Sequence, residues 1–173
     1  MDEQRISDIV KSVVAEVNGK TASNPHPHVC KCNNKLTLAK ALDLIERVER
    51  RAAEWGVNAV VAVADAGGRP IAVHCMDDAY YASYDIAVNK AFTSVALKMS
   101  TEKLGTLSQP GQPLYGIQFT NDGKLVIFGG GQPLMYRGKI VGGLGVSGGT
   151  AEQDGKLSDY GFDVFEEVMN GSK

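Results

Sequence analysis

The chain has 173 residues, a formal net charge of −2 and 22% charged residues. This length suits one main domain, and the balanced charge provides no basic surface of the kind that binds nucleic acid or an anionic membrane. The acidic start lacks the features of a secretory signal, and the longest apolar stretch, 59–64, is too short to cross a bilayer. Because the three cysteines come without an export signal, we expect a cytoplasmic protein without a disulfide framework.

The first predicted element is an amphipathic helix within residues 1–19. Isoleucines and valines recur at helical spacing along one side, and charged residues occupy the other. Asn18 and Gly19 then favour the end of the helix. Residues 20–36 contain three asparagines and two prolines without periodicity, which is typical of a flexible linker. We therefore expect the helix to be separate from a main domain over residues 37–173.

The main domain is predicted to open with a helix that begins after Thr37 and ends before a glycine. The apolar face of this helix is predicted to be buried along its whole length, including Leu38 and Trp55. Two strands follow, over 57–65 and 71–77, joined by a glycine-containing hairpin turn. Since the first strand is apolar on both faces, we expect other elements to cover both sides of the sheet.

The second half of the domain is predicted to begin with a long helix over about 80–99 and a short helix from Thr101. Three further strands are predicted over 124–128, 132–136 and 139–148. A final helix opens after Thr150. This order of elements lacks βαβ alternation and predicts an α+β domain with an antiparallel sheet of five strands.

Glycines at positions 143, 145 and 148 match the G-x-G-x-x-G pattern of dinucleotide-binding folds. That function requires a βαβ unit with a second parallel strand, and only one predicted helix follows here. We therefore interpret the motif as a glycine-rich strand that another element crosses closely.

The residues after this motif have the features of a helix start. Thr150 and Gln153 have the spacing of a capping box, and acidic residues such as Glu152 complement the helix dipole. The amides of Gly148 and Gly149 are alternatively placed to hold an anionic group of a ligand. Capping alone and a ligand-binding loop that includes Thr150 and Glu152 both remain open at this point.

Three stretches of the main domain together identify a known family. They are DAGGRPIAVHCMDDA, DIAVNKAFTSV and FGGGQPLMYRGKIVGGLGVSGGTAEQD. They closely resemble the GlcG/HbpS family, which includes the C-terminal domain of PduO, and the resemblance covers about residues 36–165. It implies a profilin-like α/β/α domain with a five-stranded antiparallel sheet and assembly into homo-oligomers. Several members of this family bind haem, and one subset is linked to cobalamin metabolism.

Two further candidate cofactor-binding residues are Lys90, which lies in a helix motif of the family, and His74, at a position where this chain departs from the family pattern. Many family members have an arginine before the Met-Asp pair at 76–77, whereas this chain has His74 and Cys75. His74 would be either an axial ligand of a haem iron or a hydrogen-bonded structural residue of a strand. Lys90 would either meet a propionate or substrate carboxylate as a point charge or be solvated. Cys75 is expected to be a buried small hydrophobe.

The linker holds further donors of types that zinc and iron prefer, namely His26, His28, Cys30 and Cys32. Their spacing does not match a closed zinc knuckle. A metal site shared across an oligomer, one axial ligand of a haem, and a plain exposed linker are the alternatives. Because ordering a linker costs conformational entropy and a strand is already ordered, we expect His74 to contribute more to haem binding than His28.

Residues 1–19 resemble the encapsulation peptides of bacterial microcompartment cargo, which are short amphipathic helices followed by flexible linkers. This implies shell proteins as partners and a location in the microcompartment lumen; the alternative is a helix that packs on its own domain or in an oligomer interface. We expect a haem- or tetrapyrrole-binding accessory protein. The alternatives are an enzyme or cofactor-handling protein in corrinoid or small-carbonyl metabolism, for which no catalytic set defines a reaction, and a ligand-free structural cargo protein.

Overall fold

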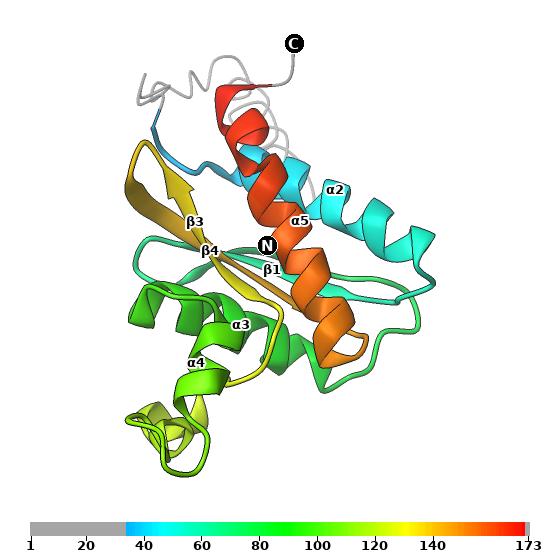
Figure 1. Ribbon diagram of the computed structural model, residues 1–173. Coiled ribbons are helices and arrows are strands. Elements are labelled where there is room, and N and C mark those ends of the chain that lie inside the picture. Colours follow the sequence, from blue (N-terminus) through cyan, green and yellow to red (C-terminus); the bar gives the residue numbers. More distant parts are fainter. Residues whose placement is uncertain (1–33, 172–173) are drawn as a thin grey trace, which may run out of the picture. The chain divides into compact units, whose positions relative to one another are not determined.

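The computed structural model describes residues 34–171 (Figure 1). Its elements in chain order are α2 (Leu38–Glu54), β1 (Val60–Asp65), β2 (Pro70–Cys75), α3 (Ser83–Leu97), α4 (Thr101–Leu107), the 3₁₀ helices η1 (Ile117–Phe119) and η2 (Asn121–Gly123), β3 (Gly131–Tyr136), β4 (Lys139–Ser147) and α5 (Ala151–Asn170). The predicted helix over residues 1–19 lies outside the described residues. Within the described part, no helix is both long and apolar enough to cross a membrane.

The sheet in the described part of the chain has four antiparallel strands in the order β2-β1-β4-β3. The predicted α+β class with an antiparallel sheet is confirmed, but the expected five strands are not found. The segment predicted as a strand over 124–128 is irregular. The Val126 amide of this segment donates a hydrogen bond to Thr93 Oγ1 of α3, at 3.1 Å, and not to a neighbouring strand.

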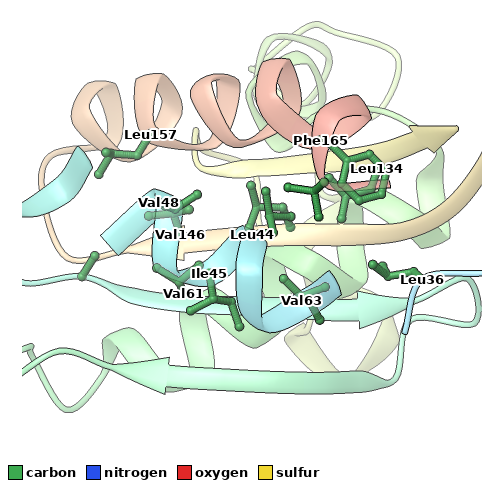
Figure 2. Close-up of a cluster of buried hydrophobic side chains, with 14 of the residues drawn as sticks. Leu36, Leu44, Ile45, Val48, Val61, Val63, Leu134, Val146, Leu157 and Phe165 are labelled. Carbon is green, nitrogen blue, oxygen red and sulfur yellow. The ribbon is translucent and has the colours of Figure 1, made fainter. Parts of the chain in front are cut away.

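Helices cover both faces of the sheet, as the doubly apolar β1 requires. α2 and α5 lie on one face, and α3 lies on the other (Figure 1). Figure 2 shows the larger core, to which α2 contributes Ile45, β1 contributes Val61 and α5 contributes Phe165. A smaller cluster joins Val60 of β1 to Ala87 of α3. Neighbouring residues of β1 therefore point into different cores, as the alternation of a strand dictates.

α2 begins as predicted, with the Thr37 hydroxyl oxygen accepting a hydrogen bond from the amide three residues on. Its buried face is shorter than the sequence pattern predicts, because Leu38 is 56% and Trp55 is 40% exposed. The fully buried residues of the helix lie between Ala41 and Ala52. The apolar residues at and just beyond the two ends of α2 therefore remain in contact with solvent.

The glycines of β4 allow α3 to lie directly against the sheet. A Cβ atom at Gly145 would collide with the carbonyl oxygen of Ala87, and one at Gly143 would collide with that of Ala91. This confirms that the glycine motif is a strand closely crossed by another element. No βαβ unit surrounds the motif in the described sheet.

Candidate functional site

Two adjoining cavities lie at the end of the sheet where β1 begins and where β2 and β4 end. The one we call the tyrosine cavity has a volume of about 400 Å³ and is lined by Val60, Cys75, Met76, Asp78, Ala79, Tyr80, Tyr81 and Tyr84. The one we call the glycine-loop cavity has a volume of about 450 Å³ and is lined by Gly56, Val57, Asn58, Asp78, Tyr80, Gly148, Gly149, Thr150 and Gln153. Cavities of this size are typical of small-molecule sites.

The tyrosine cavity lies on the α3 side of the sheet. Cys75 pairs with Val60 across the β1–β2 ladder, and Val60 packs in the cluster that contains Ala87 of α3. Paired residues of antiparallel strands point to the same face, so Cys75 faces this side as well. Cys75 is a free cysteine and is exposed, which corrects the expectation of a buried hydrophobe. It is the last residue of an edge strand.

Three tyrosines form the aromatic wall of the tyrosine cavity. Tyr80 is 73% exposed, Tyr81 is 101% exposed and Tyr84 is 49% exposed. Aromatic side chains with an apolar ring and a polar tip are common at binding surfaces, and a contiguous exposed patch of them indicates such a surface. The sequence prediction missed this wall because it began a helix at residue 80, whereas α3 begins at Ser83. Three tyrosines within five residues, separated from two aspartates by a single alanine, were the signal available in the sequence.

Asp78 lies between the two cavities and lines both of them. Its backbone is left-handed, with a φ angle of 62°. This conformation costs an L-residue about 1–2 kcal/mol, and aspartate is among the residues that adopt it most readily. The linings of the two cavities, as described, include this carboxylate but no lysine, arginine or histidine.

The amides of the loop at 148–150 are largely engaged within the protein. The Thr150 amide donates to Gln153 Oε1 at 2.9 Å, and the Gln153 amide donates to Thr150 Oγ1 at 3.2 Å, which completes a capping box. The Gly149 amide donates to Asp154 Oδ1 at 2.9 Å. The predicted capping box is therefore confirmed, and the amides of Gly149 and Thr150 are not free to bind an anion.

His74 lies on the opposite face of the sheet from the tyrosine cavity. It pairs with Val61 in the β1–β2 ladder, and its Nδ1 lies 3.2 Å from Oε1 of Glu49 on α2. Since Val61 belongs to the core beneath α2, His74 points to that side too. A haem in contact with His74 would therefore have to lie on the α2 side of the sheet.

Lys90 is fully buried between α3 and the sheet. Its Nζ donates to the carbonyl oxygen of Val146 and to Oδ2 of Asp154, each at 2.8 Å, and lies 4.8 Å from the centre of the Phe128 ring. Burial lowers the pKa of Lys90, and the carboxylate of Asp154 opposes that shift. The structure thus contradicts the alternative of a solvated Lys90 and shows its ammonium group paired inside the protein. A contact of Lys90 with a ligand carboxylate stays a prediction.

Glu152 lines a third cavity, of about 420 Å³, together with Glu102 and Phe128. Its carboxylate accepts a hydrogen bond from Lys156 Nζ at 2.6 Å, which holds the pKa of Glu152 below its usual value. Of the predicted cofactor-binding residues, only those at 148–150 line a common cavity. His74, Lys90 and Glu152 lie in separate places.

The described residues contain no group of three or more His, Cys, Asp and Glu side chains placed to hold a metal ion. The predicted linker donors His26, His28, Cys30 and Cys32 lie outside the part of the chain that the structure describes. A metal site in the linker therefore stays a prediction.

Comparison with known proteins gives one family match and several relatives. The family model described as "haem degrading protein HbpS-like" matches residues 36–163. The uncharacterized 15.0 kDa protein in the dhaT–dhaS intergenic region of Citrobacter freundii is 44% identical over 133 residues, which are 77% of this chain and 94% of that protein. The corrinoid adenosyltransferase PduO of Citrobacter freundii is 42% identical over 109 residues, which are 63% of this chain but 32% of PduO. The crystal structure of a PduOC–haem complex has a TM-score of 0.72 and 37% identity, covering 75% of this chain and 94% of that one.

Proposed function

This chain belongs to the HbpS-like family of haem degrading proteins, and we propose that it binds haem or a related tetrapyrrole in the tyrosine cavity. The family and the similarity to the haem complex of PduOC support this class of ligand. One observation supports the location: the exposed Cys75 lines the same cavity as the three tyrosines.

The lining of the tyrosine cavity suits a flat, largely apolar ligand with a metal centre. Val60 and Ala79 supply aliphatic surface, and the tyrosine rings can pack against the face or edge of a macrocycle. Thiolate and phenolate groups are known axial ligands of haem iron, and Cys75 and the tyrosines provide these two types. Because no basic side chain is among the described lining residues, we propose that the propionates of a bound haem point toward solvent.

A corrinoid is the second candidate ligand, because the chain is similar to part of the corrinoid adenosyltransferase PduO. The chain spans about a third of that relative, so the enzymatic activity of PduO does not follow from the similarity. The described lining of the tyrosine cavity places no histidine or lysine beside Cys75 as a general base. We therefore propose binding rather than catalysis at this site.

We further propose that residues 1–19 deliver the protein to the shell of a bacterial microcompartment and that the domain over 37–173 assembles into homo-oligomers. The motivation for delivery is the apolar stripe of the predicted N-terminal helix, which needs a partner surface to bury it. The motivation for assembly is the family resemblance, together with the exposed tyrosines beside the edge strand β2.

The visible absorption spectrum of the full chain, purified from iron-replete cells and then titrated with haemin, tests the proposed ligand. Haem binding predicts a Soret band that saturates at a fixed ratio of haem to protein. A corrinoid spectrum would instead support the second candidate. A colourless protein that shows no saturable change with haemin would contradict the proposal and favour a ligand-free cargo protein.

A further inference from the structure

The ion pair between Lys90 and Asp154 is the most deeply buried pair of charges among the described residues. The side chains are 0% and 4% exposed, and Nζ lies 2.8 Å from Oδ2. Lys90 also donates to the backbone at Val146, and a Cβ at Gly130 would lie 2.6 Å from its Nζ. The ammonium group is therefore enclosed on several sides and has little room to move.

Stability alone gives a weak reason for such a pair. Removing two charges from water carries a desolvation penalty that their attraction often only balances, and apolar side chains of similar volume commonly replace a buried pair without loss of stability. The environment of Asp154 indicates another role. Its Oδ1 accepts from the Gly149 amide at 2.9 Å, while its Oδ2 accepts from Lys90.

The bond from the Gly149 amide to Asp154 connects the protein interior to the wall of the glycine-loop cavity. Gly149 lines that cavity, and the cavity adjoins the tyrosine cavity through Asp78 and Tyr80. Asp154 can hold the Gly149 amide strongly only while it is an anion, because charge-assisted hydrogen bonds are the stronger ones. Lys90 is the cation that compensates this buried charge.

We infer that Lys90 and Asp154 are positioning residues, which fix the loop at 148–150 and thereby the wall beside the bound ligand. The inference rests on the proposed function for its effect on haem binding. The position of the loop itself is measurable without any ligand, so the two claims are tested separately.

Two variants of the full chain test the inference. Asp154→Asn keeps the shape of the side chain but replaces one of its two oxygens by an NH₂ donor. Lys90 and Gly149 bond to different oxygens of Asp154, so in this geometry the amide can accept from only one of them. The pair Lys90→Met and Asp154→Leu removes both charges at similar volume and is expected to fold. Asp163→Asn, an exposed position on the same helix, is the matched control.

The measurement is amide hydrogen exchange by NMR, with exchange at Gly149 divided by that at Val61 in the core to remove any global change in stability. We expect this ratio to rise about tenfold in both test variants and to stay unchanged in Asp163→Asn. An unchanged ratio in either test variant would overturn the inference.

The second readout is haemin affinity, which we expect to fall several-fold in the double variant while its melting temperature stays close to that of the wild type. A loosened loop with unaltered haemin affinity would overturn the claim that the loop supports the ligand site. If wild-type protein takes up no haemin, the proposed function fails, and the exchange ratio still decides whether the pair positions the loop.

Discussion

Cys75 lies opposite Val60 in the antiparallel ladder between β1 and β2, and both residues line the tyrosine cavity. One position earlier, His74 lies opposite Val61 and bonds to Glu49 on the other face of the sheet. Because side chains alternate along a strand, Cys75 and His74 point to opposite faces of the sheet. Of these two possible iron ligands, only Cys75 can therefore reach a ligand in the tyrosine cavity.

We therefore expect Cys75→Ser to shift the Soret band of the haem complex and to weaken binding, because serine keeps the size of the side chain and removes the thiolate. His74→Ala should leave both properties unchanged, and His28→Ala serves as a comparison in the linker. Haemin titrations of the three variants provide the measurement. A normal Cys75→Ser together with an impaired His74→Ala would place the haem on the α2 side and favour the original expectation for His74.

Much of the fold was predictable because local signals agreed with the tertiary structure. The N-cap at Thr37 and the capping box at Thr150 mark two helix starts correctly, since capping depends on side chains within a few residues. The failed prediction is the strand over 124–128. The run of apolar residues in this segment is typical of a strand. The hydrogen bond from Val126 to Thr93 on α3, however, joins distant parts of the chain, and hydrophobic periodicity does not reveal such a contact.

The candidate site was less predictable, for the same physical reason. Lys90 forms its ion pair with Asp154, which lies 64 residues further along the chain. The sequence around Lys90 therefore gives no sign of a buried ion pair. The exposure of Cys75 depends on its place at the end of an edge strand, which is known only once the strand order is known. Alternation along a strand puts neighbouring residues such as His74 and Cys75 on opposite faces, but it does not show which face has a cavity.

The hairpin between β1 and β2 should be sensitive to acid through Asp65. Its Oδ1 accepts from the amides of Gly67 and Arg69, at 2.8 and 3.0 Å, and the backbone bond from Arg69 is the main cause that lowers the pKa of Asp65. A carboxyl whose pKa is lower in the folded state contributes stability above its unfolded pKa, about 3.9, and loses it as the pH falls through the folded value.

Asp65→Asn should accordingly be less stable than wild type by about 1 kcal/mol at neutral pH, because this side chain is partly exposed. Denaturant unfolding at several pH values measures the difference between the two proteins. The difference should shrink below about pH 4. A difference that stays constant down to about pH 2 would show that the charge of Asp65 does not stabilise the hairpin.

Delivery to a shell is expected to depend on the apolar stripe of residues 1–19. The double variant Ile9→Glu and Val13→Glu places charges on that stripe and should abolish co-sedimentation with shells, while the melting temperature of the main domain stays unchanged. Ser12→Glu adds a charge between these positions and off the predicted stripe and is the control. Co-sedimentation of the double variant at the wild-type level would refute the targeting proposal.

Metal binding by the linker is expected to depend on thiolates, so it should weaken as the cysteines become protonated at low pH. Elemental analysis of wild type and of a Cys30→Ser, Cys32→Ser variant should show that the variant has lost its metal. Cys75→Ser, which changes a cysteine outside the linker, controls for nonspecific binding to thiols. Equal metal content in wild type and the linker variant would rule out Cys30 and Cys32 as ligands.

The location of the haem site is tested most directly by filling the tyrosine cavity. Ala79 lines this cavity and is half-buried, whereas Ala53 is an exposed residue of α2 that lines neither cavity. Haemin titration of Ala79→Trp and Ala53→Trp, with melting temperatures measured in parallel, compares the same substitution at both positions. We expect Ala79→Trp to lose at least about tenfold in haemin affinity, or roughly 1.4 kcal/mol, and Ala53→Trp to bind as wild type does. A folded Ala79→Trp that binds haemin with wild-type affinity would contradict a haem site in the tyrosine cavity.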